Sequence, residues 1–416
     1  KYATSARIAP VATIIGCVTT CGHDNVNQLI CHRTWLIANL VSVIQGAMLM
    51  QTNIPIGSPL AVKRWSTALA TETKKLMYFT RFIGEGDKNI IQQMTELEGE
   101  QGDTIKYDLL MNLRGEMVYG DDNVEGKEEN LSFYQDEVKI DQARKPVDLG
   151  GRMSRKRTIH HIRDSAKNAT SRFTSEWMDE LFFVYLSGTL DGRNADAKVT
   201  RAFAGNPIQA PDQFHMQYGG AATSQATMTD ADVMSRDVIE RISVMPRMMA
   251  TENTDVTRMS PVTVEGGGKH YVMLMNPWQA HSLRIEKAEL SWADIQKAAA
   301  TAEGNKNPLF RGGLGMINDV VLHQHENVRY FSNYGAGQNV GAARALFMGA
   351  QAGVVAYGEP SKGSRFSWVE KKHDADNRVA IYAGTIAGVK KTRFNGLDYG
   401  VVAVDTAARS PNRAAA

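Results

Sequence analysis

Residues 152–188 read RMSRKRTIHHIRDSAKNATSRFTSEWMDELFFVYLSG. Apolar residues recur in this stretch at steps of three or four, from Ile159 through Phe173 to Val184, and this spacing is typical of an amphipathic helix. Gly188 stands where a helix would end, because glycine readily adopts the left-handed conformation found after a helix C-terminus. The sequence therefore predicts one long helix over residues 153–186, roughly 50 Å long at the α-helical rise.

Two strands are predicted before this helix. Five apolar residues alternate strictly from Ile105 to Leu113, which is the period of a half-buried strand. Residues 131–140 form a second candidate strand, in which the apolar phase changes between Phe133 and Val138, and such a change suggests a β-bulge. The intervening residues are polar and contain several glycines. The pattern predicts a long hairpin over residues 105–140, with a tip suited to project from the body.

The rest of the chain indicates an α+β fold with one dominant helix. Residues 59–82 have the spacing of an amphipathic helical arm. Thr229 or Asp230 is a candidate N-cap for a helix that runs towards Met245, where Pro246 should interrupt it. The other predicted elements are a strand over 270–275, a helix opened by Pro277, a helix capped by Ser291, and strands over 320–322, 345–347, 379–386 and 399–404.

Composition excludes several classes of protein. The 416 residues carry a net charge of +2, from 47 basic and 45 acidic residues, whereas a protein that neutralises nucleic acid needs a large basic excess. Cys17, Cys21 and Cys31 are the only cysteines, so no disulfide framework holds the body together and synthesis in a reducing compartment fits. The longest apolar run, residues 35–50, is short for a membrane span and lacks a signal-peptide pattern. We expect neither membrane insertion nor secretion.

The first 47 residues differ from the rest of the chain. They begin with Lys1 and show neither clean helical nor clean strand periodicity, and interpretable patterns start after Met48 and Met50. We hypothesise that the native start is Met48 or Met50, and that residues 1–47 are an atypical, non-native extension.

Charges are segregated along the chain. Residues 116–141 contain nine acidic residues and two lysines, and residues 152–172 contain seven basic residues and one aspartate. Two interpretations stay open. The two regions are separately solvated faces, or the acidic hairpin of one subunit lies over the basic long helix of another, where complementary charge steers and registers an interface. The second interpretation assigns an inter-subunit contact to Asp121, Asp122, Glu125, Glu128, Glu129, Arg152, Arg155, Lys156, Arg157 and Arg163.

Motifs for chemistry are incomplete. Residues 335–341, GAGQNVG, have one residue too many for a dinucleotide fingerprint and follow no predicted strand directly. His323 and His325 could bind a metal from one face of a strand, but no third ligand is evident nearby. A pair of satisfied or exposed histidines is therefore favoured. The N-terminal cysteines, with His23 and His32, match no ordinary zinc module. We expect no catalytic residue, no metal and no organic cofactor.

Twelve short segments, read in order, carry a resemblance to a known family. They are AVKRW (61–65), FIGEG (82–86), GDTI (102–105), LRG (113–115), YGD (119–121), LSFYQDEVK (131–139), GGRMSRKR (150–157), MDELF (178–182), YGGAAT (218–223), DIQKAA (294–299), ARAL (343–346) and TRFNG (392–396). Together they resemble the major capsid proteins of N-four-type podophages and their relatives. The resemblance runs from about residue 58 to 408 and is lost over residues 1–47.

The resemblance implies a Hong Kong 97-type phage capsid fold, in which the predicted hairpin is the extended loop and the predicted long helix is the spine helix. The implied division of the chain is an N-terminal arm over 48–95, the extended loop over 96–150, the spine helix over 151–188, a mainly peripheral domain over 189–260 and 368–416, and a mainly axial domain over 261–367.

The implied function is that of a major capsid protein. It would self-assemble into the hexamers and pentamers of an icosahedral tailed-phage head that encloses double-stranded DNA, without enzymatic activity, in a virion built in the bacterial cytoplasm. Expected partners are further copies of the chain, a portal, scaffold or decoration proteins, and packaged DNA without sequence-specific recognition; no membrane partner is expected.

Two other functions are weighed against this one. An encapsulin-like compartment shell shares the fold, and a soluble metal-dependent enzyme would use His323 and His325. Some shells of this fold crosslink their subunits through a lysine, and Lys127 lies at the predicted hairpin tip. No partner asparagine or catalytic acid can be matched, so crosslinking is not expected.

Overall fold

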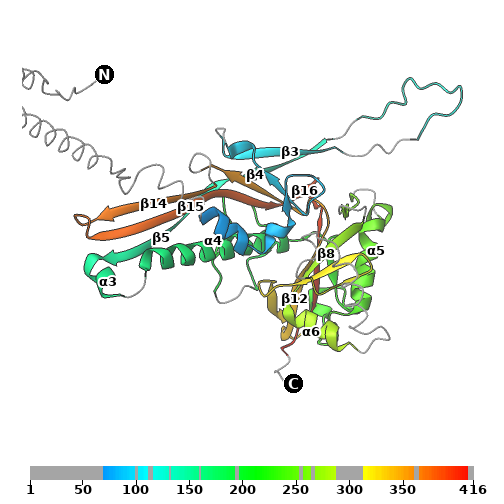
Figure 1. The fold of residues 1–416 in the computed structure, drawn as a ribbon. Coiled ribbons are helices and arrows are strands. Elements are labelled where there is room, and N and C mark those ends of the chain that lie inside the picture. The colour runs from blue at the N-terminus through cyan, green and yellow to red at the C-terminus, as the bar shows by residue number, and fades with distance from the viewer. Residues whose placement is uncertain are drawn as a thin grey trace, which may run out of the picture. The chain divides into compact units, whose positions relative to one another are not determined.

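In a computed structural model of the chain (Figure 1), every described residue belongs to one compact unit within Val62–Ala416. The described ranges are 69–98, 102–110, 116–130, 133–158, 161–192, 196–252, 256–263, 268–286, 313–359 and 365–410. The three cysteines, the first ten residues of the predicted amphipathic arm (59–68) and the helix predicted to begin at Ser291 lie outside the described residues. The described remainder of that arm is helical over residues 69–76.

The first sheet is built around β15, a strand of 14 residues. It pairs antiparallel with β13, β14 and β5, and β13 continues the sheet through parallel pairing with β2 and then β1. The prediction of a strand over 379–386 is confirmed, and the strand is longer than predicted. The sheet comprises β1 (Ile83–Gly84), β2 (Ile91–Met94), β5 (Asp141–Gly151), β13 (Gly353–Gly358), β14 (Phe366–His373) and β15 (Arg378–Lys391).

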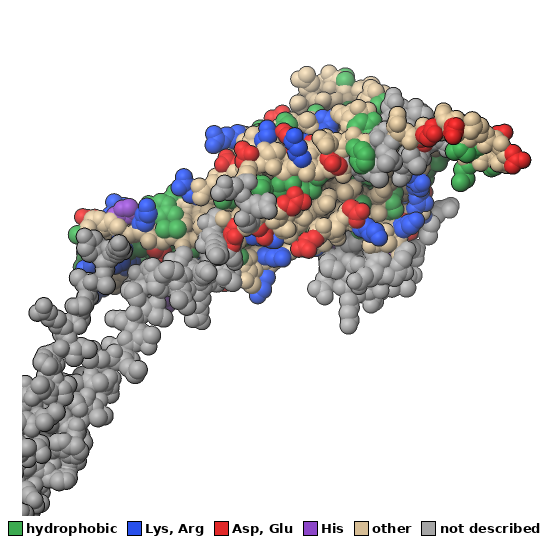
Figure 2. Space-filling view, turned by 90° about the horizontal axis from the view of Figure 1, so that it is seen from above, with side chains coloured by type: hydrophobic (Ala, Val, Ile, Leu, Met, Phe, Trp, Pro, Cys, Tyr) green, Lys and Arg blue, Asp and Glu red, His purple; other side chains and the backbone are tan. Residues whose placement is uncertain are grey.

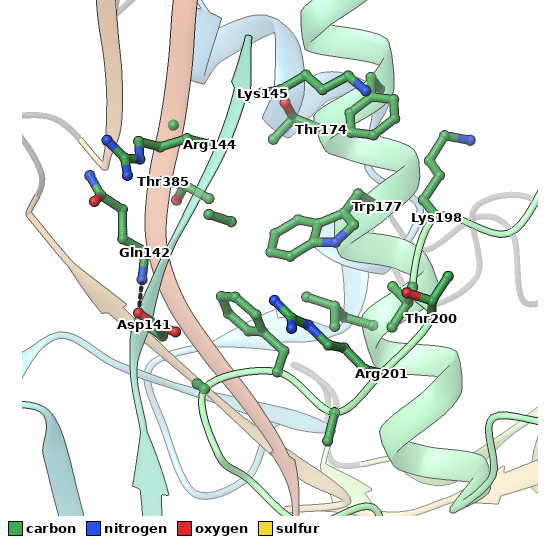
Figure 3. Close-up of a pocket in the computed structure, with 18 of the residues that line it drawn as sticks. Asp141, Gln142, Arg144, Lys145, Thr174, Trp177, Lys198, Thr200, Arg201 and Thr385 are labelled. Carbon is green, nitrogen blue, oxygen red and sulfur yellow. Dashed lines mark hydrogen bonds between the residues drawn. The ribbon is translucent and has the colours of Figure 1, made fainter.

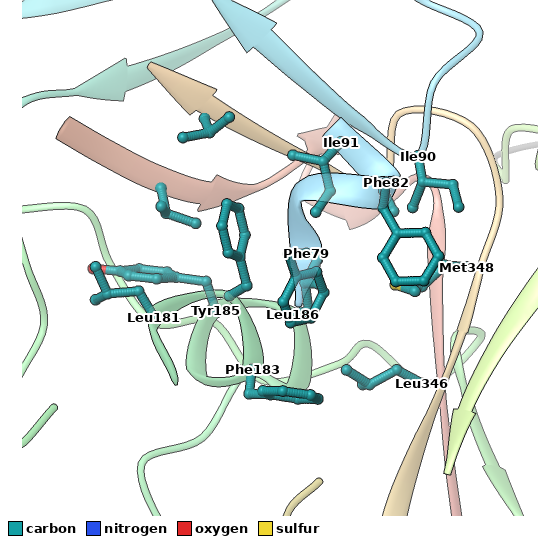
Figure 4. Packing of buried hydrophobic residues seen from close by; sticks show 14 of the residues in the cluster. Phe79, Phe82, Ile90, Ile91, Leu181, Phe183, Tyr185, Leu186, Leu346 and Met348 are labelled. Carbon is teal, nitrogen blue, oxygen red and sulfur yellow. The ribbon is translucent and has the colours of Figure 1, made fainter. Parts of the chain in front are cut away.

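The long helix α4 (Ile162–Ser187) runs along this sheet, as Figure 1 shows. Its last ten residues are all buried, in a core shared with Phe79 and Phe82 of the short 3-10 helix η3 (Phe79–Phe82) (Figure 4). The predicted end of the helix is confirmed. Gly188 has a φ of 69°, and its N–H donates to the carbonyl of Val184.

The prediction of one unbroken helix is wrong. The stretch forms α3 (Arg152–Arg157) and α4, and Thr158 between them is extended, with φ −92° and ψ 145°. A contact distant in sequence bonds α3 to the body separately from α4. Asn377, in the turn between β14 and β15, accepts a hydrogen bond from the Arg152 N–H, and its carbonyl accepts one from the Arg155 guanidinium. These bonds hold α3 against that turn. The long helix is therefore α4 alone, whose 26 residues span about 39 Å at the α-helical rise.

The second sheet carries the other core. Its strands follow the order β6-β18-β12-β8-β10-β9, with β11 paired to β12 and β7 paired to β8. The strands predicted over 270–275, 320–322, 345–347 and 399–404 are confirmed within it. Its members are β6 (Met216–Tyr218), β7 (Val262–Thr263), β8 (Lys269–Met275), β9 (Gly315–Ile317), β10 (Val320–Gln324), β11 (Tyr330–Tyr334), β12 (Val340–Met348) and β18 (Val401–Ala407).

Two helices belong to this second core. α6 (Pro277–Ile285) begins at Pro277 as predicted, and Asn276 caps it by accepting a hydrogen bond from the Trp278 N–H at 3.1 Å. α5 (Arg236–Glu252) differs from its prediction at both ends. It starts later because the Asp232 carboxylate binds the N–H and hydroxyl of Thr229 and folds that segment into a turn.

Pro246 does not interrupt α5. A proline inside a helix costs about 3 kcal/mol, because it removes one hydrogen bond and crowds the preceding turn. The helix nevertheless continues to Glu252. Its apolar face, with Val238, Ile239 and Ile242 before the proline and Met249 after it, is buried in the second core. Burial of that face offsets the cost of the proline.

The predicted hairpin is confirmed as β3 (Thr104–Leu110) paired antiparallel with β4 (Phe133–Lys139). The predicted bulge is wrong, because the register runs without a shift from Thr104 opposite Lys139 to Leu110 opposite Phe133. Val138 and Ile105 face each other at the buried base of the hairpin, whereas Phe133, at the other end, is 57% exposed. The change of apolar phase reflects where the hairpin leaves the core.

The sheets do not follow the two ranges expected for the peripheral and axial domains. β13, from the range 261–367, lies in the first sheet, while β6 and β18, from the ranges 189–260 and 368–416, lie in the second. The chain therefore passes between the sheets several times, and each sheet draws strands from both ranges.

Candidate subunit interfaces

The base of the β3–β4 hairpin is fixed to the body by one carboxylate and one amide. The Asp136 carboxylate accepts hydrogen bonds from the Tyr107 hydroxyl at 2.9 Å and the Arg393 N–H at 3.2 Å, and it pairs with the Lys390 ammonium. Asn206 accepts from the Lys139 N–H and donates to the Lys139 carbonyl, so its side chain prolongs the strand pairing. These contacts fix the direction in which the hairpin leaves the body.

The hairpin tip, residues 116–130, has no strand, and nearly all of its side chains are exposed. All five acidic residues assigned to the contact lie here and are exposed. Two backbone hydrogen bonds shape the tip, from Asp122 to the Tyr119 carbonyl and from Lys127 to the Val124 carbonyl. Each of these turns contains a glycine in the left-handed region, Gly120 at 62° and Gly126 at 87°. The tip is therefore a pair of turns.

Large apolar side chains also lie on the hairpin tip, and the charge pattern of the sequence assigned no role to them. Met117, Tyr119 and Val124 are 80%, 78% and 61% exposed. Figure 2 shows green apolar and red acidic side chains together at that end of the molecule. Their presence within a turn-rich acidic segment was a signal available from sequence, because such a segment has no core of its own in which to bury them.

The basic cluster consists of the five basic residues assigned to the contact. Four of them lie on α3, and Arg163 lies in the first turn of α4. Two are bonded within the chain: Arg155 through its bond to Asn377, and Arg163 through an ion pair with Glu370 at 2.7 Å. Arg152, Lys156 and Arg157 are exposed. Figure 1 shows α3 and the hairpin tip at opposite ends of the described unit, so one chain does not bring the two sets together.

A side groove of about 530 Å³ lies between β5, the middle of α4 and the loop of residues 198–205 (Figure 3). Aromatic side chains from α4 and the loop form its floor: Phe173, and Trp177 packed edge-on against Phe203 at 5.1 Å. The Lys145 ammonium lies 4.2 Å from the centre of the Phe173 ring. Arg144, Lys198 and Arg201 also line the groove, and Lys198 pairs with Glu176 at 2.6 Å. The groove is therefore aromatic at its floor and mainly cationic around it.

The two histidines flagged by their spacing lie in aromatic packing. His323 is fully buried in β10, with its ring 5.4 Å from that of Phe82. The His325 ring lies 4.5 Å from Tyr78 and 4.9 Å from Phe183, and burial lowers the pKa of His325 to about 4. Among the described residues, no three or more His, Cys, Asp or Glu side chains are grouped so that they could hold a metal ion.

The same packing holds the segment that precedes β1. The Asp179 carboxylate of α4 accepts the Tyr78 and Phe79 N–H groups at 2.9 and 3.1 Å. Burial raises the pKa of Asp179 to about 6, although both hydrogen bonds favour the charged form. One carboxylate thus fixes η3 onto the long helix.

None of the helices in the described ranges is long and apolar enough to cross a bilayer.

Comparison with known proteins identifies the class. The phage capsid protein family matches residues 53–410. The chain is 27% identical over 376 residues to the major capsid protein of Pseudomonas phage KPP25, an alignment that covers 83% of this chain and 94% of that protein. Among solved structures, the capsid of Ralstonia phage GP4 is 50% identical, with a TM-score of 0.76 over 87% of this chain and 100% of that chain. The cyanophage Pam1 capsid, 22% identical with a TM-score of 0.60 over 79% and 92%, shares the fold.

The chain belongs to the phage capsid protein family. It is a homologue of major capsid proteins, and the predicted function as a major capsid protein of a tailed phage is confirmed. The predicted α+β, Hong Kong 97-like capsid fold is confirmed as well. The encapsulin-like alternative is not favoured.

Proposed function

We propose that this chain forms the hexamers and pentamers of an icosahedral head that encloses double-stranded DNA, and that it belongs to the N-four-type lineage of such shells. The observation that carries the proposal is the 50% identity with a solved phage capsid over most of the chain. The net charge of +2 agrees with a wall that surrounds DNA without neutralising it. The role is structural and not enzymatic. Assembly takes place in the host cytoplasm, with a portal and scaffold or decoration proteins as partners.

The two sheets support a division into the domains of this fold. We assign the first sheet and α4 to the peripheral domain with its spine helix, and the second sheet with α5 and α6 to the axial domain. The β3–β4 hairpin is the extended loop. It is anchored at its base by Asp136 and exposes its tip, so a subunit presents this tip to whatever lies beside it.

The acidic hairpin tip and the basic cluster are proposed to meet between neighbouring subunits. Opposite ends of one chain carry the opposite charges, so two copies placed side by side can bring them together. An exposed ion pair contributes less than about 1 kcal/mol and is screened over about 8 Å at physiological salt. A single charge substitution should therefore change the rate of assembly little. The combined charge of all the acidic residues of the tip should speed assembly by steering the subunits together.

The test reverses four tip charges at once, in the variant Asp121→Lys, Asp122→Lys, Glu125→Lys and Glu128→Lys. Light scattering at low salt should show assembly slowed at least tenfold, because like charges then face each other at every interface. The free energy of unfolding of the subunit should stay within about 0.5 kcal/mol, since these side chains are exposed. Adding Arg152→Glu, Lys156→Glu and Arg157→Glu in the same chain should restore part of the rate.

A control variant changes the net charge by the same amount away from the tip, at four other exposed acids: Glu85→Lys, Asp87→Lys, Asp191→Lys and Asp196→Lys. It should assemble at close to the native rate. Normal assembly of the tip variant at low salt would show that the tip and the basic cluster do not meet. Unfolding of the tip variant as a subunit would place the contact within one chain.

A further inference from the structure

A buried ion pair lies where the chain passes from the first sheet to the second. Lys391 ends β15, and Asp398 ends β17 (Leu397–Asp398), which pairs with β16 (Arg393–Phe394) shortly before β18 begins. The Lys391 ammonium is 2.6 Å from Oδ2 of Asp398, and the two side chains are 3% and 1% exposed. The pair therefore closes a short hairpin that connects the two sheets.

The charged form of this pair has little support from its surroundings. An ammonium group carries several N–H donors, and among the described residues that of Lys391 reaches a single acceptor, Oδ2 of Asp398. The ammonium of Lys390, by contrast, pairs with Asp136 and also donates to the Glu137 carbonyl. Burial lowers the pKa of Lys391 and raises the pKa of Asp398, so both shifts favour the neutral groups. Transfer of one proton from nitrogen to oxygen leaves a nucleophilic amine against a carboxylic acid.

Neighbouring charged groups hold the Asp398 carboxyl group in place. The Asp212 carboxylate accepts the Asp398 N–H at 2.7 Å. Burial raises the pKa of Asp212, but the hydrogen bond with His215 outweighs burial and lowers that pKa to about 2, so Asp212 is ionised. Nε of Arg393 is 2.9 Å from Oδ1 of Asp398, and neither atom makes a hydrogen bond within the described structure. This cation lies beside the oxygen that gains negative charge when a nucleophile adds to Cγ.

We propose that Lys391 and Asp398 condense to an amide bond within one chain. The lone pair of Nζ adds to Cγ of Asp398, and the tetrahedral group that results loses the carboxyl hydroxyl. This hydroxyl leaves as water with one hydrogen of the amine, so Nζ keeps one hydrogen and nothing is oxidised or reduced. Burial of the two groups in contact makes the step intramolecular and excludes bulk water.

The bond forms once in each chain, so it is a self-modification and not turnover of a substrate. It would fix the crossing between the sheets, because β15 belongs to the first sheet and β18 to the second. An ion pair opens when its partners are pulled apart or unfolded, whereas an amide bond persists in denaturant. The proposal concerns a link within one chain and does not depend on the proposed function.

The mass of the full chain, measured after unfolding in denaturant, tests the proposal directly. The chain should be lighter than its sequence requires by the mass of one water molecule. Trypsin does not cut after a lysine whose amine is acylated, so digestion should give residues 391–393 joined to residues 394–409 as one branched peptide. Fragmentation of this peptide should place the link between Lys391 and Asp398.

Two conservative variants separate this link from other losses of water. Lys391→Arg keeps the positive charge but cannot form the amide, because a guanidinium group does not lose its proton in a protein, so this chain should have its full mass. Lys390→Arg, the matched control, changes the neighbouring lysine, which pairs with Asp136 instead, and should keep the loss of water. Circular dichroism checks that both variants fold. A native chain of full mass, or a loss of water that persists in Lys391→Arg, would overturn the proposal.

Discussion

At the scale of single residues, two glycines with the same backbone conformation differ in how well they should tolerate a side chain. Gly188 and Gly205 have nearly the same φ, 69° and 70°. A Cβ at Gly188 would lie 2.1 Å from the carbonyl oxygen of Gln209, whereas a Cβ at Gly205 would meet nothing within 4 Å. Only the first position combines the unfavourable left-handed conformation with a clash against backbone.

We therefore predict that Gly188→Ala destabilises the subunit by about 3 kcal/mol, and that Gly205→Ala costs about 1 kcal/mol, which is the left-handed conformation alone. Denaturant titration of the unassembled subunit gives both free energies of unfolding. Equal losses at the two positions would show that the backbone near Gln209 moves aside, and that the end of α4 is not rigidly packed.

At the scale of elements, long-range contacts set where helices and strands end and how they are directed. Asn377 bonds α3 to the turn between β14 and β15, and Asp136 joins the hairpin to β15 and to the residues after it. The Asp136–Lys390 pair is largely buried, with side chains 11% and 9% exposed. Removing one member of such a pair leaves a charge in a poorly solvated place, and removing both does not.

We predict that Asp136→Ala lowers the free energy of unfolding by about 3 kcal/mol, because the largely buried Lys390 ammonium then loses its carboxylate and keeps the Glu137 carbonyl as an acceptor. Lys390→Met in the same chain should recover about half of that loss, while the hydrogen bonds from Tyr107 and Arg393 stay broken. A double-mutant cycle measured by chemical denaturation gives the coupling. Strictly additive losses would mean that the two side chains do not stabilise each other.

At the scale of the whole molecule, the part of the chain that matches the capsid family begins at residue 53. We predict that a chain starting at Met48 assembles within about twofold of the full chain, because it keeps the whole matched region. Negative-stain microscopy and sedimentation report shells directly. As a control, a chain starting at residue 83 loses Phe79 and Phe82, which are 0% and 2% exposed in the core beside α4, and should not fold. Failure of the Met48 chain to assemble would show that residues 1–47 are required for assembly.

Local sequence determined much of the fold. The 3.6-residue period located α4 and the 2-residue period located β3, and residue chemistry located the boundaries at Gly188 and Pro277. These features depend on neighbours within a few residues, which is why they can be read from the chain alone. The segregation of acidic and basic residues is also a property of the sequence, although their place on the surface is not.

Only the tertiary structure decided the rest, because the deciding partners are distant in sequence. β5 escaped prediction since most of its residues are exposed or half-buried, and its pairing with β15 lies more than 200 residues away. α3 is bonded at its first residue to Asn377, and α5 continues through Pro246 because its apolar face is buried on both sides of that residue. The side groove gathers β5, α4, β15 and the 198–205 loop, and no local period connects these segments. Its shape exists only once the sheet and the helix have packed together.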